Sequence, residues 1–281
     1  LKNSPRTAML VPSGAPVVWM HCESPEDEAG RIGARIAELH ESGVPYRDMA
    51  ILYRAHYVTR SIEEVFLRLK LPYVIYSGVQ FFARAEVKDA LSYLRLLAYR
   101  DDLSFLRVAN VPRRNLGRRR MEYLRGYAVK NACSLYDALC RCLDDELFRG
   151  TKARRLVSLV EELSAGCEGR SIAELLSDVL NRSGYEEYLR TEGSQERLDN
   201  LAELKQSVRE YEETSGEECS LTHYLSHVAL FSNSDADTGR DAVKLMTIHA
   251  AKGLEFPYVF LCCLNEGILP SKKTDSPEGM E

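Results

Sequence analysis

Membrane-spanning and secretory segments are missing from this sequence of 281 residues. No apolar run approaches the roughly 18 residues that a membrane-spanning helix needs, and no signal peptide is recognisable. The eight cysteines form no CxxC pair, which argues against the common zinc and redox motifs and favours reduced cysteines that serve packing. We therefore expect a cytoplasmic globular protein with no metal site and no membrane contact.

A general excess of basic residues is also missing. The chain has 37 Lys or Arg against 42 Asp or Glu, so its net charge of -5 does not by itself indicate nucleic-acid binding. The charge is uneven, however. Residues 203–218 are strongly acidic, whereas a run of eight residues contains five arginines: Arg113, Arg114, Arg118, Arg119 and Arg120. A local cluster of this kind can still hold phosphates.

Alternating strand and helix patterns characterise the first hundred residues. Strands are predicted at 17–22, 49–53 and 71–76, and helices at 25–43, 59–69 and 85–99. This alternation has the spacing of βαβ units, which predicts a parallel sheet with right-handed crossovers.

Helical patterns then dominate up to residue 240. They are predicted at 103–109, 119–130, 135–142, 152–163, 172–181, 196–214 and 221–231, and a polar linker follows at 232–239. The strand pattern returns at residue 241. The sequence therefore predicts an α/β domain, residues 1–98 and 241–281, that is interrupted by an inserted all-helical domain, residues 99–240.

Residues 241–264 read as a strand, a polar loop and a second strand. The second apolar run, 258–264, is almost unbroken, which suits a parallel strand covered on both faces. The loop concentrates a hydroxyl, an imidazole, an ammonium group and a carboxylate between two apolar runs: Thr247, His249, Lys252 and Glu255, with Gly253 among them. Loops that leave the carboxyl ends of parallel strands are where such sheets bind ligands. This loop is therefore the first candidate binding site.

Residues 247–256 (TIHAAKGLEF) closely resemble motif V of the UvrD/Rep/PcrA group of superfamily 1 DNA helicases. Residues 50–64 are similar to the Tyr-Arg-x-Asn-x-x-Ser-Arg segment of that group, and residues 78–95 are similar to its motif IVa. The resemblance implies that residues 1–98 and 241–281 form a RecA-like second motor domain, called 2A. Residues 99–240 would then be the helical domain 2B.

The resemblance implies an ATP-driven helicase that moves 3′-to-5′ on DNA in repair, recombination or replication. ATP and Mg²⁺ would be bound mainly by a first motor domain, because the sequence holds no GxxxxGK[ST] phosphate loop and no strand with a Mg²⁺-binding acid. The start at Leu1 and the finish at Glu281 suggest a piece of a longer chain. We expect no catalytic residue within it and no ATP hydrolysis by it alone.

The resemblance also assigns candidate contacts. Glu255, Gly253 and Lys252 would lie at the nucleotide, with Glu255 on the ribose. The residues expected to contact single-stranded DNA are Thr247, His249, Arg54, His56, Arg60 and Lys88. His56 stands where the group commonly has Asn. The turn Asn115–Gly117, with Arg118 and Arg119 after it, corresponds to a Gly-Ile-Gly hairpin that offers backbone N–H groups to duplex phosphates.

The expected partners are single-stranded DNA and junctions of single- and double-stranded DNA, in a bacterial cytoplasm and at its nucleoid. Repair proteins or a second copy are further candidates for the helical insert. Two alternatives stay open: a helicase subunit of the RecB/AddA helicase–nuclease type, and a non-catalytic module that binds DNA or protein. The sequence does not specify the pathway.

Overall fold

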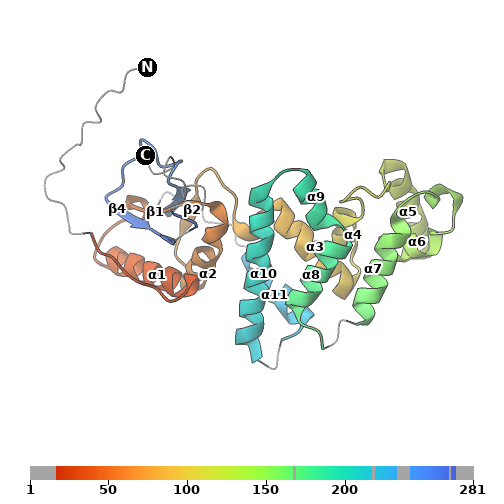
Figure 1. The fold of residues 1–281 in the computed structure, drawn as a ribbon, viewed down its shortest axis with the longest axis horizontal. Helices are drawn as coiled ribbons and strands as arrows, with labels where there is room; N and C mark the ends of the chain where they lie inside the picture. The colour runs from red at the N-terminus through yellow and green to blue at the C-terminus, as the bar shows by residue number, and fades with distance from the viewer. Residues whose placement is uncertain (1–16, 167–168, 217–218, 233–240, 266, 270–281) are drawn as a thin grey trace, which may run out of the picture.

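The computed structural model describes residues 17–166, 169–216, 219–232, 241–265 and 267–269. A parallel sheet with two helices forms one end of the molecule, and a group of helices extends away from it (Figure 1). The strands are β1 (Met49–Tyr53), β2 (Tyr73–Ile75), β3 (Val243–Thr247) and β4 (Tyr258–Leu261). Their order in the sheet is β2-β3-β1-β4, and every neighbouring pair is parallel. This confirms the predicted α/β class with a parallel sheet.

Two amphipathic helices cover one face of the sheet. They are α1 (Pro25–Glu41) and α2 (Thr59–Leu69). The predicted start of α1 is confirmed, because the Ser24 hydroxyl accepts a hydrogen bond from the Asp27 amide and Pro25 occupies the first turn. Both helices bury aliphatic and aromatic side chains against β1 and β3 in a single cluster. That burial holds the carboxyl ends of the strands in place.

Two strand predictions need correction. Residues 17–22 do not form a strand, and Trp19 is 73 % exposed. Their apolar pattern is real, but no neighbouring strand pairs with it among the described residues. The second strand of the motif V region was expected to be covered on both faces. Instead β4 is the edge strand of the sheet that the described residues form, with Val259 and Leu261 about half exposed.

The chain leaves the sheet after β2 and returns to it at β3. The helices between are α3 (Ala85–Tyr99), α4 (Asp102–Val108), α5 (Arg118–Asn131), α6 (Leu135–Cys142), α7 (Ala153–Ala165), α8 (Ile172–Arg182), α9 (Tyr185–Thr191), α10 (Gln195–Ser215) and α11 (Leu221–Ser232). The predicted helices therefore agree closely with those observed, except that α9 was missed. The predicted linker at 232–239 lies outside the described residues from residue 233 onward.

Core packing divides the described residues into two clusters. The side chains of α3, together with Phe81 and Phe82, belong to the larger cluster, which the later helices form. The smaller cluster consists of the sheet with α1 and α2. The division into 1–98, 99–240 and 241–281 stays a prediction, although the packing groups α3 with the helices that follow it.

Within the described residues, no helix is both long and apolar enough to cross a membrane. The same residues contain no group of three or more His, Cys, Asp or Glu side chains placed to hold a metal ion.

Candidate nucleic-acid interface

The ends of β1 and β3 meet at one edge of the sheet. Tyr53 and Thr247, the last residues of the two strands, are register partners, and the Ile248 amide donates to the Tyr53 carbonyl at 2.9 Å. The loops that follow these strands therefore emerge side by side. The structure brings together the predicted DNA contacts of both loops. Arg54 and His249 are exposed, and His56 is half-buried.

His56 occupies a slot beside the end of β1. Its Nδ1 lies 3.4 Å from the Tyr53 hydroxyl. A Cβ atom placed on Gly78 would lie 2.7 Å from Cε1 of His56, so only glycine leaves room for the ring at this position. Burial and the nearby Arg84 guanidinium lower the pKa of His56. The imidazole is therefore neutral at neutral pH and acts as a hydrogen-bonding group rather than a cation.

The loop after β3 is a compact series of turns that exposes its polar side chains. The Thr247 hydroxyl accepts from the Ala250 amide at 3.2 Å, and Gly253 has a φ of 87°, which L side chains rarely adopt. Lys252 and Glu255 flank Gly253 and are both exposed. This turn thus presents an ammonium group and a carboxylate to solvent.

Arg60 has a different role from the predicted phosphate contact. Its side chain is 3 % exposed and lies within 3.2 Å of four carboxylates: Glu26 in α1, Glu64 in α2, and Glu203 and Glu210 in α10. Although burial lowers the pKa of this guanidinium, the surrounding carboxylates outweigh burial and raise it. Arg60 therefore ties α2 to α1 and α10, and its donors are directed at these carboxylates rather than at DNA.

Arg84 donates to the His56 carbonyl in the loop after β1, and Lys88 lies one helical turn after Arg84. Lys88, in the second turn of α3, is partly exposed, as a phosphate contact requires. Arg84, just before α3, is 8 % exposed and bonded within the protein. The sequence motif that contains both residues gave no sign that one is buried and the other is not.

The predicted hairpin lies at the far end of the helical part. Asn115, which stands where the helicase group has Gly, adopts a φ of 62°. This is the left-handed conformation, which Gly adopts readily and Asn adopts occasionally. The Asn110 side chain accepts from the amides of Arg114 and Leu116 at 2.9 and 3.1 Å. The Arg114 guanidinium is buried and donates to the Val108 carbonyl at 2.8 Å and to the Tyr93 hydroxyl at 2.7 Å. Arg114 therefore holds the hairpin in its conformation. The sequence did not distinguish this buried arginine from its exposed neighbours.

The hairpin leads into an open helix end. Gly117 is the N-cap residue of α5 and supplies no side-chain cap, so the first amides of the helix remain available. Arg118 is 92 % exposed and pairs with Glu122, and Arg119 is exposed. Arg120, by contrast, donates to the carbonyls of Leu147 and Asn115. Gly117, Arg118 and Arg119 thus stay where an anionic backbone can reach them.

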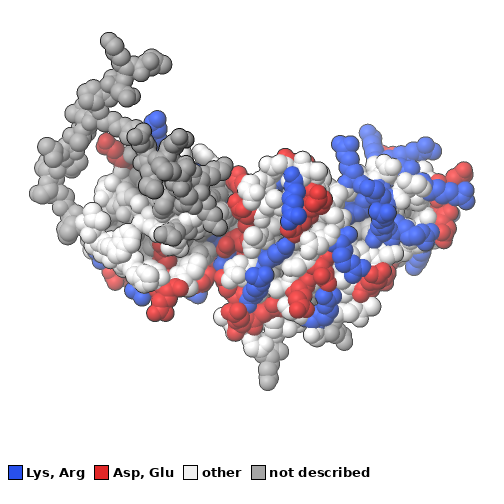
Figure 2. Space-filling view, in the orientation of Figure 1, with Lys and Arg blue, Asp and Glu red and all other residues white. Residues whose placement is uncertain are grey.

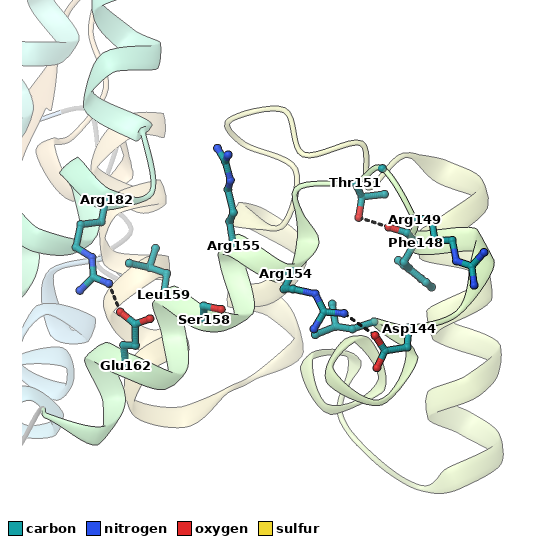
Figure 3. Close-up of a pocket in the computed structure, with 12 residues that line it drawn as sticks. Asp144, Phe148, Arg149, Thr151, Arg154, Arg155, Ser158, Leu159, Glu162 and Arg182 are labelled. Atoms are coloured by element: carbon teal, nitrogen blue, oxygen red, sulfur yellow. Dashed lines mark hydrogen bonds and ion pairs between the residues drawn. The ribbon is translucent and has the colours of Figure 1, made fainter.

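An arginine-lined groove lies beside the hairpin, between the segment that follows α6, residues 143–151, and α7, with Arg182 of α8 also in its lining (Figure 3). Its volume is about 860 Å³. Two of its arginines are paired, Arg154 with Asp144 and Arg182 with Glu162. The others, Arg149 and Arg155, have no acidic partner within the described part of the chain. The Lys152 amide donates to the Arg114 carbonyl at 3.1 Å, which joins the groove to the hairpin. This groove was not predicted, although the run FRGTKARR at 148–155 is a visible signal.

The positive charge of the molecule is concentrated at this end. Residues 113–155 contain twelve Lys or Arg and five Asp or Glu, a net charge of +7 in a chain whose net charge is -5. Figure 2 shows Lys and Arg gathered over α5, α6 and α7, with acidic residues more frequent towards α10. The two candidate surfaces, the strand-end loops and the hairpin with its groove, thus lie at opposite ends of the molecule (Figure 1).

Comparison with known proteins places this geometry in context. The sequence profile of the UvrD-like helicase C-terminal domain matches residues 6–281. The "ATP-dependent DNA helicase PcrA" of Staphylococcus aureus (strain MRSA252) is 36 % identical over 274 residues, which cover 95 % of this chain and 38 % of the relative. The PcrA helicase of Staphylococcus epidermidis (strain ATCC 12228) is 36 % identical over 266 residues, 92 % of this chain and 36 % of the relative.

The chain thus spans little more than a third of the length of the curated relatives that it matches. The profile match covers nearly the whole sequence, and it includes both the strand-end loops and the arginine-rich hairpin. This chain belongs to the family of UvrD-like helicase C-terminal domains.

Proposed function

We propose that this chain is the DNA-gripping C-terminal part of an ATP-dependent 3′-to-5′ DNA helicase. The observation that carries the proposal is that this one chain has two separate surfaces, each with exposed groups that can contact phosphates. The strand-end loops fit single-stranded DNA, and the hairpin end fits a duplex. In this proposal the sheet with α1 and α2 is the second motor domain and the later helices are its inserted domain.

The single strand would contact the loops after β1 and β3. Arg54 supplies an exposed guanidinium, and His56 and His249 supply imidazoles that hydrogen-bond to phosphate or sugar without reading base sequence. Thr247 and Lys88 extend this surface. Apart from Lys88, which lies in α3, these groups come from the carboxyl edge of a parallel sheet, the position at which such sheets bind ligands.

The duplex would contact the hairpin and the adjoining groove. Asn115 and Gly117 present backbone amides, while Arg118, Arg119, Arg149 and Arg155 present side chains. Together they offer several separate donors to a phosphate backbone. Arginine suits this role because its planar fork pairs with two phosphate oxygens at once.

Nucleotide contact would come from the turn at Gly253. The exposed carboxylate of Glu255 fits a ribose hydroxyl, and Lys252 lies beside it. The chain contains no phosphate loop, so the chemistry of ATP and Mg²⁺ belongs to a domain with that motif. The residues present here would bind and orient the sugar end of the nucleotide. A helicase of this kind would act at the bacterial nucleoid.

Fluorescence anisotropy on labelled DNA tests the proposal. The probes are oligothymidylate, a blunt duplex and a 3′-tailed duplex, each titrated from low to physiological salt. We expect binding to all three, with affinity that falls steeply with salt because counterions are released. Two double variants, R118A/R119A and R149A/R155A, should each reduce the salt slope on duplex by about 1 to 2 and leave oligothymidylate binding unchanged.

The matched control is R31A/R35A on α1. These two arginines are exposed and paired with carboxylates on the same helix, so their loss removes the same charge from a surface outside both sites. An equal effect of the control on duplex binding would show a response to net charge alone. Absence of binding to any probe at low salt would contradict the proposal and favour a module that binds protein.

A further inference from the structure

A buried arginine links the helical part to the loop that faces the single strand. The Arg84 guanidinium donates to the His56 carbonyl at 2.9 Å and to the Thr59 hydroxyl at 3.1 Å. It also donates to the Val79 carbonyl at 3.3 Å and to Oδ1 of Asn200 at 2.7 Å. Three of these acceptors lie in the sheet part, and the fourth lies in α10. One side chain therefore joins the two parts of the molecule.

The side chain of Asn200 is held by a second hydrogen bond in addition to the one from Arg84. It is 2 % exposed, and its amide nitrogen donates to the Glu86 carboxylate at 2.5 Å. Glu86 is itself buried, at 5 % exposure, in the first turn of α3. The Asn200 side chain therefore cannot rotate without losing both a charge-assisted acceptor position and a donor position.

Glu63 also holds the loop after β1 in place. The Thr59 hydroxyl donates to the Glu63 carboxylate at 2.5 Å, and the Phe81 amide donates to it at 3.0 Å. Arg84 stacks over the Phe81 ring at 5.1 Å. Each of these polar groups therefore has a partner within the junction, and together they fix the backbone of His56.

We propose that Arg84 is a positioning residue through which α10 sets the conformation of the DNA-facing loop, residues 54–59. The helix contacts this loop directly at the turn that contains His56. Arg84 does not touch DNA in this arrangement. It transmits the placement of Asn200 to the carbonyl of His56, and thereby orients Arg54 and the His56 ring. The DNA readout of this role depends on the proposed function, but the structural role does not.

Exchanging the amide of Asn200 with the carboxylate of Glu86 tests this role. The variant N200D keeps the acceptor for Arg84 but replaces the donor to Glu86 with a second carboxylate oxygen, so two like charges face each other at hydrogen-bond distance. Adding E86Q restores a donor between the two positions with the direction reversed. The double variant E86Q/N200D therefore keeps the network and its total charge, whereas N200D breaks it. The control is Q195E, the same change from amide to acid at an exposed site of α10.

Hydrogen–deuterium exchange of the free chain is the first readout. We expect N200D to speed amide exchange in residues 54–60 by about tenfold while β1 and β3 remain protected, since a broken buried network opens locally. E86Q/N200D should return the rate to within about twofold of wild type, and Q195E should leave it unchanged. Unchanged exchange in N200D, or no recovery in the double variant, would overturn the proposal.

Binding is the second readout. N200D should weaken oligothymidylate binding by about fivefold and leave blunt-duplex binding unchanged, because the hairpin lies at the other end of the molecule. E86Q/N200D should restore it. If N200D does not fold, Asn200→Ala takes its place with the same expectations. If the wild-type chain binds neither probe, the proposed function fails, and the exchange comparison still decides the positioning role.

Discussion

Arg60 Nε lies 2.6 Å from Oε1 of Glu203, although 143 residues separate them in the sequence. Arg60 belongs to α2, beside the sheet, and Glu203 belongs to α10, in the helical part. The pair stands at the centre of a cluster in which one guanidinium faces four carboxylates. This contact and the one between Arg84 and Asn200 together attach α10 to the loop after β1.

Replacing Arg60 with Ala should destabilise the chain by about 2 to 4 kcal/mol, because four carboxylates would be left facing one another without a cation. The loss lies below the value for a fully buried pair because the carboxylates are 20 to 44 % exposed. Urea unfolding measures it. The control Arg31→Ala removes an ion pair at the surface and should have a much smaller effect, since solvent screens such pairs. Equal losses in the two variants would contradict the central role of Arg60.

Replacing Glu63 with Gln should flatten the dependence of stability on pH. Burial raises the pKa of Glu63 from 4.5 to about 7, against the opposing effect of hydrogen bonds from Thr59 and Phe81. The folded state therefore holds a proton that the unfolded state releases. This stabilisation is complete below pH 4.5 and is lost as the pH rises to about 7.

The size of the Glu63 contribution follows from the shift of its pKa and is on the order of 3 kcal/mol. Urea unfolding of wild type and Glu63→Gln at pH 5 and pH 8 measures it. The difference in stability between the two proteins should change by this amount in favour of the variant at pH 8. A constant difference across the pH range would show that Glu63 keeps an ordinary pKa.

Replacing Gly78 with Ala should weaken single-strand binding. The added Cβ would lie 2.7 Å from Cε1 of His56 and 2.9 Å from Cγ2 of Ile75, so the imidazole must leave its slot. We expect affinity for oligothymidylate to fall about fivefold and affinity for blunt duplex to stay unchanged, because only one of the two surfaces is altered. The control Gly30→Ala meets no atom within 4 Å and should not affect binding. Unchanged binding by Gly78→Ala would place His56 outside the interface.

Asn115 should tolerate glycine but not alanine. Its φ of 62° is accessible to Asn and Gly, whereas an alanine there costs about 1 kcal/mol. Thermal unfolding should show a lower midpoint for Asn115→Ala, and Asn115→Gly should match wild type. Duplex affinity should follow the same order, since the turn presents its amides only in this conformation. Equal behaviour of the two variants would mean that the hairpin backbone relaxes without cost.

Hydrophobic periodicity in the sequence determined most of the secondary structure. The helices 103–109 to 221–231 were predicted within a few residues because apolar side chains recur on one face, and core packing requires that face. The parallel sheet followed from the alternation of strands and helices. The short helix α9 was missed because it buries only two side chains, Tyr185 and Leu189, which are too few for a periodic pattern. Residues 17–22 were overpredicted because a strand also needs a partner.

Local chemistry in the sequence also indicated which segments carry function, but it did not reveal which side chains are exposed. Within the arginine run 113–120, Arg114 is buried among backbone carbonyls while Arg119 faces solvent, and the residue types are identical. Arg54 and Arg60 differ in the same way. An arginine becomes structural when distant acceptors surround it. Those acceptors, such as Glu203 and Asn200, come from helices far along the chain, so only the tertiary structure decides which arginines remain free to bind phosphate.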